Sequence, residues 1–216
     1  MTCCHADGIE HKFDHANANK QLRRLRRRGP SKNTRLLIES LADSVAGASL
    51  IDIGGGVGTI HHLLLDAGAK SAVHVDISNA YLDVAREEAA RRGHAGQVRF
   101  IHGDFVEVAR DVPAADVVAL DRVICCYPDM DALLGRAAEK TRRLLGAVYP
   151  RDAWWVRAAL VWINTLQRLR RSSFRLYFHA PAAIDARLRG EGLTQTSLRR
   201  TAFWEIVRYE RAEPNA

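Results

Sequence analysis

The chain has 216 residues and a mass of 24.1 kDa, which is the size of one large domain with a single hydrophobic core. Its content of 47% hydrophobic and 26% charged residues is typical of a soluble globular protein. No apolar run is long enough to span a membrane, and no apolar segment typical of a signal peptide follows the first residues. We therefore expect a cytoplasmic protein and exclude the transmembrane and secreted classes.

The net charge of +7 is concentrated near the N-terminus, where eight basic residues and no acidic one occur from Lys20 to Arg35. This density indicates either an anionic partner or a solvated helix face. The anion could be a nucleic acid, an acidic lipid surface or a small substrate with carboxylates or phosphates. No aromatic residue is interleaved with the arginines, which favours a small anionic substrate over nucleic acid. Residues 1–32 are treated as a basic N-terminal segment, and residues 33–216 as the main domain.

Between residues 33 and 149, helix-like and strand-like segments alternate, as in a parallel sheet that helices cover on both faces. The predicted strands are residues 48–53, 71–75, 98–102, 116–121 and 146–149. The predicted helices are residues 33–46, 59–67, 79–92 and 130–145. With right-handed crossovers, these elements form a doubly wound α/β fold whose ligand lies beyond the carboxyl ends of the strands.

The strongest local signal follows the first predicted strand, where Asp52 precedes three glycines at alternate positions. Gly54, Gly56 and Gly58 lack a Cβ, so the backbone can turn sharply and approach a ligand closely. Their spacing, D-x-G-x-G-x-G, differs from the dinucleotide pattern G-x-G-x-x-G, because position 59 is Thr. The loop therefore indicates a nucleotide-like ligand.

Acidic residues also end the other predicted strands, at Asp76, Asp104 and Asp121. Taken singly, each is most simply a helix cap or a turn residue. Because the carboxyl ends of parallel strands meet at one edge of the sheet, we expect these acids to lie around one crevice together with the glycine loop.

This pattern resembles motif I and the neighbouring stations of the class I S-adenosylmethionine (SAM)-dependent methyltransferases. The resemblance implies SAM as the cofactor, with Asp76 at the ribose hydroxyls, Asp104 at the adenine amino group and Phe105 beside the ring. It also implies a Rossmann-like, seven-stranded, mostly parallel sheet with a C-terminal antiparallel hairpin, here residues 194–201 and 203–210. The implied cofactor-binding residues are Asp52, Gly54, Gly56, Gly58, Asp76, Ile77, Asp104, Phe105 and Asp121.

Within this superfamily the chain is most similar to the magnesium-protoporphyrin IX methyltransferases, which esterify a porphyrin propionate. The similarity rests on the basic N-terminal segment with a Gly29-x-x-x-x-Thr34 turn, the strand tip at residues 75–78 and a Tyr-Pro-Arg stretch at 149–151. The Phe13-Asp14 region matches the family's opening only loosely. The resemblance implies methyl transfer to a small acidic or aromatic acceptor such as a porphyrin carboxylate.

Residues 121–128 lack the N/D-P-P-Y/F sequence of methyltransferases that act on exocyclic amines, which counts against methylation of DNA bases. Two alternatives stay open. The first is an RNA-modifying methyltransferase, because of the arginine-rich segment. The second is a non-catalytic partner subunit with the same fold, although its expected loss of loop glycines or acids is not seen.

Residues 152–171 read as an amphipathic helix that contains Trp154, Trp155 and Trp162. These tryptophans are interpreted as core, as a substrate lid or as a membrane contact. Because the segment interrupts the alternation after the fifth strand, we expect residues 152–179 to form a substrate cap. Polar residues near the strand tips are the catalytic candidates: His179, Tyr177 and Asp121. A carboxylate acceptor would need no general base, because it is already ionised.

The four cysteines occur as two adjacent pairs, Cys3-Cys4 and Cys125-Cys126. Neither pair has the C-x-x-C spacing of a zinc site, so we predict reduced thiols and no metal. The alternative is a metal site that combines the first pair and His5 with Cys125 or Cys126. The oligomeric state is left open.

Overall fold

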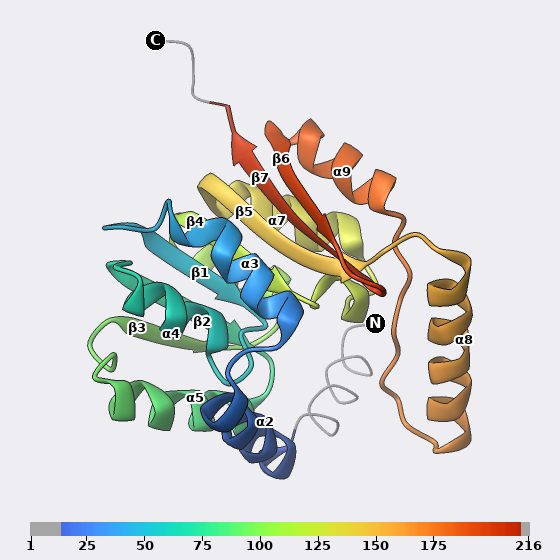
Figure 1. The fold of residues 1–216 in the computed structure, drawn as a ribbon, viewed down its shortest axis with the longest axis horizontal. Helices are drawn as coiled ribbons and strands as arrows, with labels where there is room; N and C mark the ends of the chain where they lie inside the picture. Colours follow the sequence, from blue (N-terminus) through green and yellow to red (C-terminus); the bar gives the residue numbers. More distant parts are fainter. Residues whose placement is uncertain (1–13, 213–216) are drawn as a thin grey trace.

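The computed structural model describes residues 14–212 and is built on one seven-stranded sheet in the order β3-β2-β1-β4-β5-β7-β6 (Figure 1). The strands are β1 (Ser49–Ile53), β2 (Ser71–Asp76), β3 (Val98–His102), β4 (Ala115–Asp121), β5 (Thr141–Pro150), β6 (Leu193–Arg200) and β7 (Trp204–Arg211). The helices are α2 (His15–Arg28), α3 (Lys32–Ala42), α4 (Thr59–Asp66), α5 (Asn79–Arg92), α6 (Phe105–Val108), α7 (Met130–Lys140), α8 (Trp154–Leu169) and α9 (Pro181–Gly190). Cys3, Cys4, His5 and Phe13, which the sequence analysis discusses, lie outside the described residues.

The topology confirms the predicted doubly wound sheet. Strands β1 to β5 pair in parallel, and the strand order reverses between β1 and β4. The last two strands form the predicted antiparallel hairpin, with β7 inserted between β5 and β6. The reversal at β1 and β4 opens a crevice at the carboxyl ends of these strands, where a ligand can enter.

Successive residues of the central strands point to opposite faces of the sheet. Because apolar side chains occur on both faces, helices cover both of them. On one face, Val118 of β4 belongs to a buried cluster with Leu134 of α7 and Leu188 of α9. On the other face, Val117 of the same strand belongs to a cluster with Leu37 of α3. Residues 117–120 of β4 are accordingly all apolar and buried, as expected for a central strand of a parallel sheet that is covered on both sides.

The predicted boundary between the helix at 130–145 and the strand at 146–149 is wrong. Helix α7 ends at Lys140, and β5 begins at Thr141 and runs to Pro150. Leu144 pairs with Val117 of β4 and with Glu210 of β7. Pairing with two neighbouring strands overrides the local helical pattern of this segment, as tertiary contacts commonly do.

The basic N-terminal segment contains a helix, α2, that packs on the main domain. Its apolar residues Ala18, Leu22 and Leu25 are buried in a cluster with Val57 and Tyr81. The basic residues of α2 occupy the rest of its surface, so the helix is amphipathic.

An ion-pair cluster fixes α2 to α5. The buried carboxylate of Glu88 accepts hydrogen bonds from Arg26 of α2 and from Arg91 and Arg92 of its own helix. Hydrogen bonds from the three guanidinium groups outweigh its desolvation and lower the pKa of Glu88 far below its usual range. Arg26 is therefore the arginine of α2 that bonds to Glu88 and fixes the position of this helix.

Helix α8 stands at the edge of the molecule, at the right of Figure 1. Its side chains Trp154 and Trp162 are 77% and 69% exposed, and Trp155 is also exposed. The interpretation of these tryptophans as core residues is therefore wrong. Among residues 14–212, no helix is both long and apolar enough to cross a membrane.

Close packing of α3 on β5 gives a prediction for stability. A Cβ added to Gly146 would lie 2.7 Å from Leu37 Cδ1 and 2.9 Å from Leu41 Cδ1. We expect Gly146→Val to lower the free energy of unfolding by about 1 to 3 kcal/mol through overpacking. Urea denaturation measures this, with Gly190→Val as the control because its Cβ would meet nothing within 4 Å. Equal stability of the two variants would contradict the packing described.

Candidate functional site

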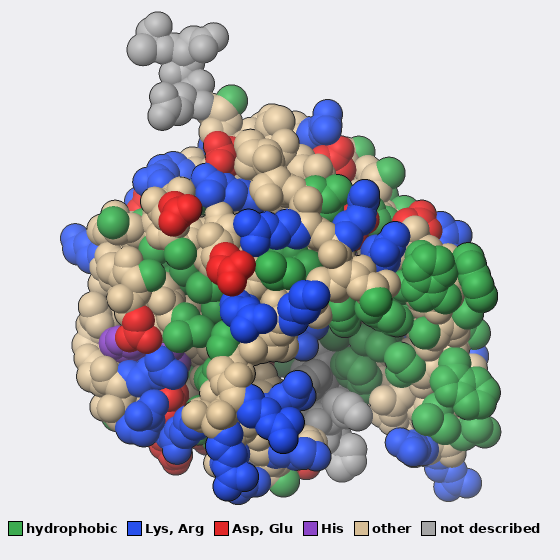
Figure 2. Space-filling model, viewed as in Figure 1, with side chains coloured by type: hydrophobic (Ala, Val, Ile, Leu, Met, Phe, Trp, Pro, Cys, Tyr) green, Lys and Arg blue, Asp and Glu red, His purple; other side chains and the backbone are tan. Residues whose placement is uncertain are grey.

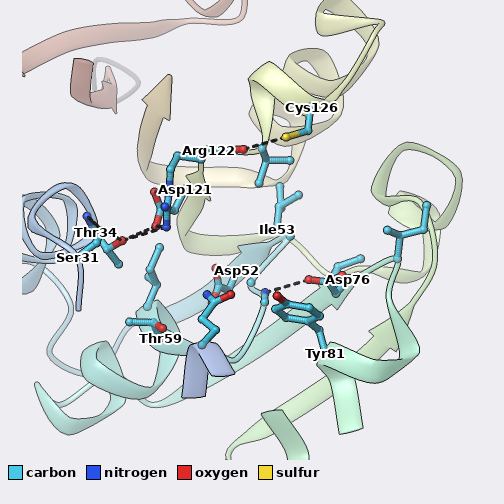
Figure 3. Close-up of a pocket in the computed structure, with 18 of the residues that line it drawn as sticks. Ser31, Thr34, Asp52, Ile53, Thr59, Asp76, Tyr81, Asp121, Arg122 and Cys126 are labelled. Carbon is cyan, nitrogen blue, oxygen red and sulfur yellow. Dashed lines mark hydrogen bonds and ion pairs between the residues drawn. The ribbon is translucent and has the colours of Figure 1, made fainter. Parts of the chain in front are cut away.

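A cavity of about 720 Å³ lies at the carboxyl ends of the central strands (Figure 3). Its floor consists of the strand ends and the glycine loop, and its rim comes from α2, the turn at residues 29–31 and the loop after β4. Residues that line it include Asp52, Gly54, Gly56, Asp76, Ile77, Asp104, Phe105 and Asp121. The structure thus brings together all the predicted cofactor residues except Gly58, which ends the loop at the start of α4.

The glycine loop depends on left-handed backbone conformations. Gly54, Gly56 and Gly58 have φ angles of 59°, 58° and 81°, a region that costs other residues energy. A Cβ on Gly56 would meet the Tyr81 ring at 3.5 Å, an ordinary contact. Glycine is therefore required at this position by the backbone angle. Its missing side chain also leaves the adjacent part of the cavity open to a ligand.

Asp76 fixes this loop to the end of β2. Its Oδ2 accepts the amide hydrogen of Gly56 at 2.9 Å, and its Oδ1 accepts that of Ser78 at 2.9 Å. The carboxylate lies at the cavity with 11% of its side chain exposed. Each carboxylate oxygen has a second acceptor site, so Asp76 can also accept ligand hydroxyl groups.

Asp52 lies directly beneath the glycine loop and bonds to a histidine. Its Oδ2 is 2.9 Å from Nδ1 of His61, and its Oδ1 has no hydrogen-bond partner among the described residues. Burial is the main reason that the pKa of Asp52 is raised to about 6. A Cβ on Gly55 would lie 2.7 Å from this carboxylate and 3.0 Å from His74 Nε2, so glycine is required there for space.

The sequence analysis missed a layer of buried histidines under the loop. His61, His62 and His74 are fully buried, and His62 Nδ1 lies 3.1 Å from Nδ1 of His94. Burial lowers the pKa of His61 well below its ordinary value and that of His62 to about 3. His61 and His62 are therefore uncharged at neutral pH. A signal for this layer was present, because two adjacent histidines occur in the apolar helix that begins after Gly58.

At the third strand, Asp104 bonds to a residue from the loop after β4. The hydroxyl of Tyr127 donates to both carboxylate oxygens of Asp104 at 3.0 Å, and the amide of Val106 donates to Oδ1. Burial and the neighbouring Asp104 raise the pKa of Tyr127 above its usual range, so its hydroxyl keeps its proton. Phe105 lines the cavity but is mostly buried in the core. Ile77 lies at the cavity beside Asp76.

Asp121, a predicted catalytic residue, is held by two neighbours (Figure 3). Its Oδ2 accepts the Thr34 hydroxyl at 2.6 Å, and Arg122 donates to each oxygen at 3.0 Å. Arg122 has a φ of 62°, a strained angle for a residue with a side chain, which is typical of functional sites. This geometry fits a carboxylate that positions Arg122 and Thr34 at the cavity.

The other two catalytic candidates do not line the cavity but contact residues that do. The amide of Tyr177 donates to the Cys125 carbonyl at 2.7 Å, and His179 Nε2 lies 2.8 Å from the Tyr127 carbonyl. Neither side chain is among the residues that line the cavity, whereas the adjacent Leu176 is. His179 must donate through Nε2, so only its Nδ1 is left to accept a proton.

Within the described part of the chain, no group of three or more His, Cys, Asp or Glu side chains has the geometry of a metal site. Cys125 and Cys126 are free thiols, with their sulfur atoms 4.0 Å apart at the cavity.

Comparisons with known proteins show a similarity to methyltransferases. Residues 50–145 match the family model described as a methyltransferase domain. This segment of the chain is therefore similar to a methyltransferase domain. The matched segment runs from β1 to the middle of β5 and contains the glycine loop and all four strand-tip acids.

A curated relative is the ribosomal protein L11 methyltransferase of Edwardsiella ictaluri, which is 31% identical over 98 residues. The match covers 42% of this chain and only about a third of the length of that relative (33%).

Solved structures share the fold over most of the chain. The magnesium protoporphyrin IX methyltransferase of Synechocystis PCC 6803 with bound S-adenosylhomocysteine has a TM-score of 0.72, at 20% identity over 94% of this chain and 98% of that one. An O-methyltransferase family protein of Burkholderia thailandensis has a TM-score of 0.69, at 19% identity over 84% of this chain and 56% of that one. These likenesses confirm the predicted architecture.

The buried histidine layer gives a prediction for pH. Below pH 6.5 an unfolded chain binds a proton at His62, whereas the folded protein does so only near pH 3. Stability from this residue is therefore lost as the pH falls from 6.5 towards 3. We expect His62→Gln to flatten the pH dependence of the free energy of unfolding by about 1.4 kcal/mol per pH unit between pH 6 and 4.

Urea denaturation at a series of pH values measures this slope. The control is His15→Gln, because His15 lies exposed on α2. An unchanged slope in His62→Gln would show that the folded protein accepts the proton at this site.

Proposed function

We propose that the enzyme binds SAM along the floor of the cavity and transfers its methyl group to a small anionic acceptor at the basic rim. The observation that supports this proposal is that the floor and the rim of the cavity carry opposite charges. Asp76 and Asp104 present carboxylates on the floor, whereas Lys20, Arg24 and Arg122 line the rim.

The floor fits SAM in the chemistry of its groups. The ribose offers two hydroxyl donors to Asp76, and the adenine amino group is a donor that suits Asp104. The glycine loop leaves the backbone of Gly54 and Gly56 accessible to the methionine part of the ligand. Ile77 and Phe105 supply apolar surface for the adenine ring. Asp52 supports the loop from below, and Gly58 precedes α4. Both residues therefore affect SAM binding indirectly, through the conformation of the loop.

The rim fits an acceptor that carries a negative charge. Lys20 and Arg24 lie one turn apart on the cavity side of α2. Arg122 reaches the same space from the end of β4, where Asp121 and Thr34 orient its guanidinium. A guanidinium binds a carboxylate in bidentate geometry, and Arg24 and Arg122 are positioned to share this task.

When bound, SAM supplies a sulfonium-activated, electrophilic methyl group. The task of the protein is to hold the acceptor oxygen in line with that methyl group at about 3 Å and to exclude water. Arg122 and α2 orient the acceptor, and Leu176 and Trp204 give the cavity wall apolar surface. A carboxylate needs no base at neutral pH.

An acceptor that is protonated at neutral pH would need a base. His179 is our proposal for this role, through its Nδ1, with Tyr177 beside it at a ring distance of 6.3 Å. Both would reach the acceptor only if the cap at residues 152–179 moved towards the cavity. Asp121 is assigned to positioning, because Thr34 and Arg122 occupy its oxygens.

A carboxylate on an aromatic or porphyrin scaffold is the acceptor class that we favour. The fold is shared with a magnesium protoporphyrin IX methyltransferase over nearly the whole chain. The features that recognise its charged group here are the α2 helix and the oriented Arg122.

The cofactor site predicts a large effect of Asp76. We expect Asp76→Ala to weaken SAM binding by about 2 to 4 kcal/mol, because two charge-assisted hydrogen bonds to the ribose are lost. Titration calorimetry with SAM and S-adenosylhomocysteine measures this. The control is Asp83→Ala, an exposed acid on α5 whose loss should leave binding unchanged. Wild-type affinity in folded Asp76→Ala would place the cofactor elsewhere.

The basic rim predicts an effect on the acceptor alone. We expect the double variant Lys20→Gln with Arg24→Gln to raise the acceptor KM by roughly tenfold to a hundredfold at low salt and to leave SAM affinity unchanged. The matched control is Arg23→Gln with Arg27→Gln, which removes the same charge from α2 outside the cavity. Arg26 is retained in both variants, because it anchors α2.

Screening acceptors with methyl-labelled SAM identifies the substrate for this assay. Labelling of RNA, with tight binding that weakens steeply with salt, would contradict the small-acceptor proposal and support an RNA-modifying enzyme.

A further inference from the structure

The outer face of α8 is apolar and exposed. Trp154, Trp162 and Leu169 are 77%, 69% and 76% exposed, and Val161 and Trp155 lie on the same side. At 3.6 residues per turn, these side chains occupy about a third of the helix circumference. Figure 2 shows apolar side chains gathered over α8 at the right of the molecule. Single exposed apolar residues are common, but a patch with three tryptophans marks an interaction surface.

Positive charge predominates along this segment, although Arg157 is paired with Asp152 at the start of the helix. No acidic residue occurs between residues 153 and 184, whereas five arginines do. They are Arg157, Arg168, Arg170, Arg171 and Arg175. Arg168, Arg170 and Arg171 are all exposed at the C-terminal end of the helix. The partner of this face therefore combines an apolar interior with negative charge at its boundary.

The opposite face of α8 is fixed to the protein. Val156 and Leu160 are buried, and Asn164 bonds the backbone of Leu176 in both directions, at 2.7 and 2.9 Å. At the edge of the outer face, the half-exposed Trp155 also contacts the protein, because its indole donates to the Ala202 carbonyl at 3.4 Å. The exposed tryptophans thus project from a helix that is already docked, and rotating the helix to bury them would break these contacts.

We propose that α8 is an interfacial helix that docks the enzyme on an anionic lipid bilayer. Tryptophan and leucine insert at the level of the headgroups, and arginines beside them bind lipid phosphates. The helix lies in the plane of the membrane, since it is too short to cross it. This binding needs no catalytic step, so it stands independently of the acceptor proposed above.

Membrane contact is coupled to the cavity through one segment. Residues 174–179 run back from α8, with Leu176 held by Asn164 on one side and lining the cavity on the other. Figure 2 shows the apolar side chains over α8 and the basic side chains over α2 on the same face of the molecule. A docked α8 therefore places the cavity wall next to the lipid surface.

Vesicle cosedimentation of the full chain tests the proposal. The probes are vesicles of phosphatidylcholine alone and vesicles of phosphatidylcholine mixed with phosphatidylglycerol. We expect binding to the anionic vesicles, a blue shift of tryptophan emission on binding, and little binding to the neutral ones. Absence of binding to anionic vesicles at low salt would overturn the proposal.

A variant of the apolar face separates insertion from simple charge attraction. Trp154→Ser, Trp162→Ser and Leu169→Ser combined should lower the partition coefficient by at least about tenfold and abolish the blue shift, with an unchanged melting temperature because all three side chains are exposed. Unchanged binding of this variant would contradict insertion. A wild-type dimer that this variant converts to a monomer, together with no vesicle binding, would assign the face to a second copy of the chain.

Two variants with equal charge loss locate the electrostatic part. The first removes three arginines at the end of α8 and the second removes three from α2: Arg168→Gln, Arg170→Gln and Arg171→Gln, against Arg23→Gln, Arg27→Gln and Arg28→Gln. We expect the α8 variant to bind anionic vesicles roughly a hundredfold more weakly and the α2 variant to keep most of its binding. Equal losses would show that net charge alone drives adsorption, which would overturn the role of α8.

Discussion

The site depends on one hydrogen bond, from the amide of Gly56 to the carboxylate of Asp76. It joins the loop after β1 to the end of β2 and stabilises left-handed backbone angles that only glycine adopts at low cost. Because the same carboxylate also caps the turn before α5 through Ser78, its position is fixed from two sides. The crevice created by the reversed strand order thereby becomes a shaped floor with an acceptor of hydrogen bonds at its centre.

Charge is distributed around this floor in distinct layers. Below it, burial keeps His61 and His62 neutral and raises the pKa of Asp52 to about 6. Above it, α2 brings positive charge to the cavity rim, and Arg26 fixes that helix by its bonds to Glu88. The separation of an acidic floor from a basic rim is what gives the cavity two different binding ends.

Local chemistry explains which features could be predicted from the sequence. The strand ends, the glycine loop and the acids at Asp76 and Asp104 follow from short-range patterns, and the structure brings them together. The start of β5 could not be found, because pairing with β4 and β7 decides it. The bond from Tyr127 to Asp104 and the folding of Arg122 onto Asp121 depend on loop conformations that no periodicity encodes. The exposure of the α8 tryptophans likewise required knowledge of which face the protein buries.

A crystal structure of the protein with S-adenosylhomocysteine tests the central claim most directly. The account predicts the ligand in the cavity, with both ribose hydroxyls donating to Asp76 and the adenine amino group within hydrogen-bond distance of Asp104. The Gly56 amide should keep its bond to Asp76, because the loop is already in its binding conformation. A ligand bound away from Asp76, or a loop rebuilt around it with that bond broken, would contradict the account.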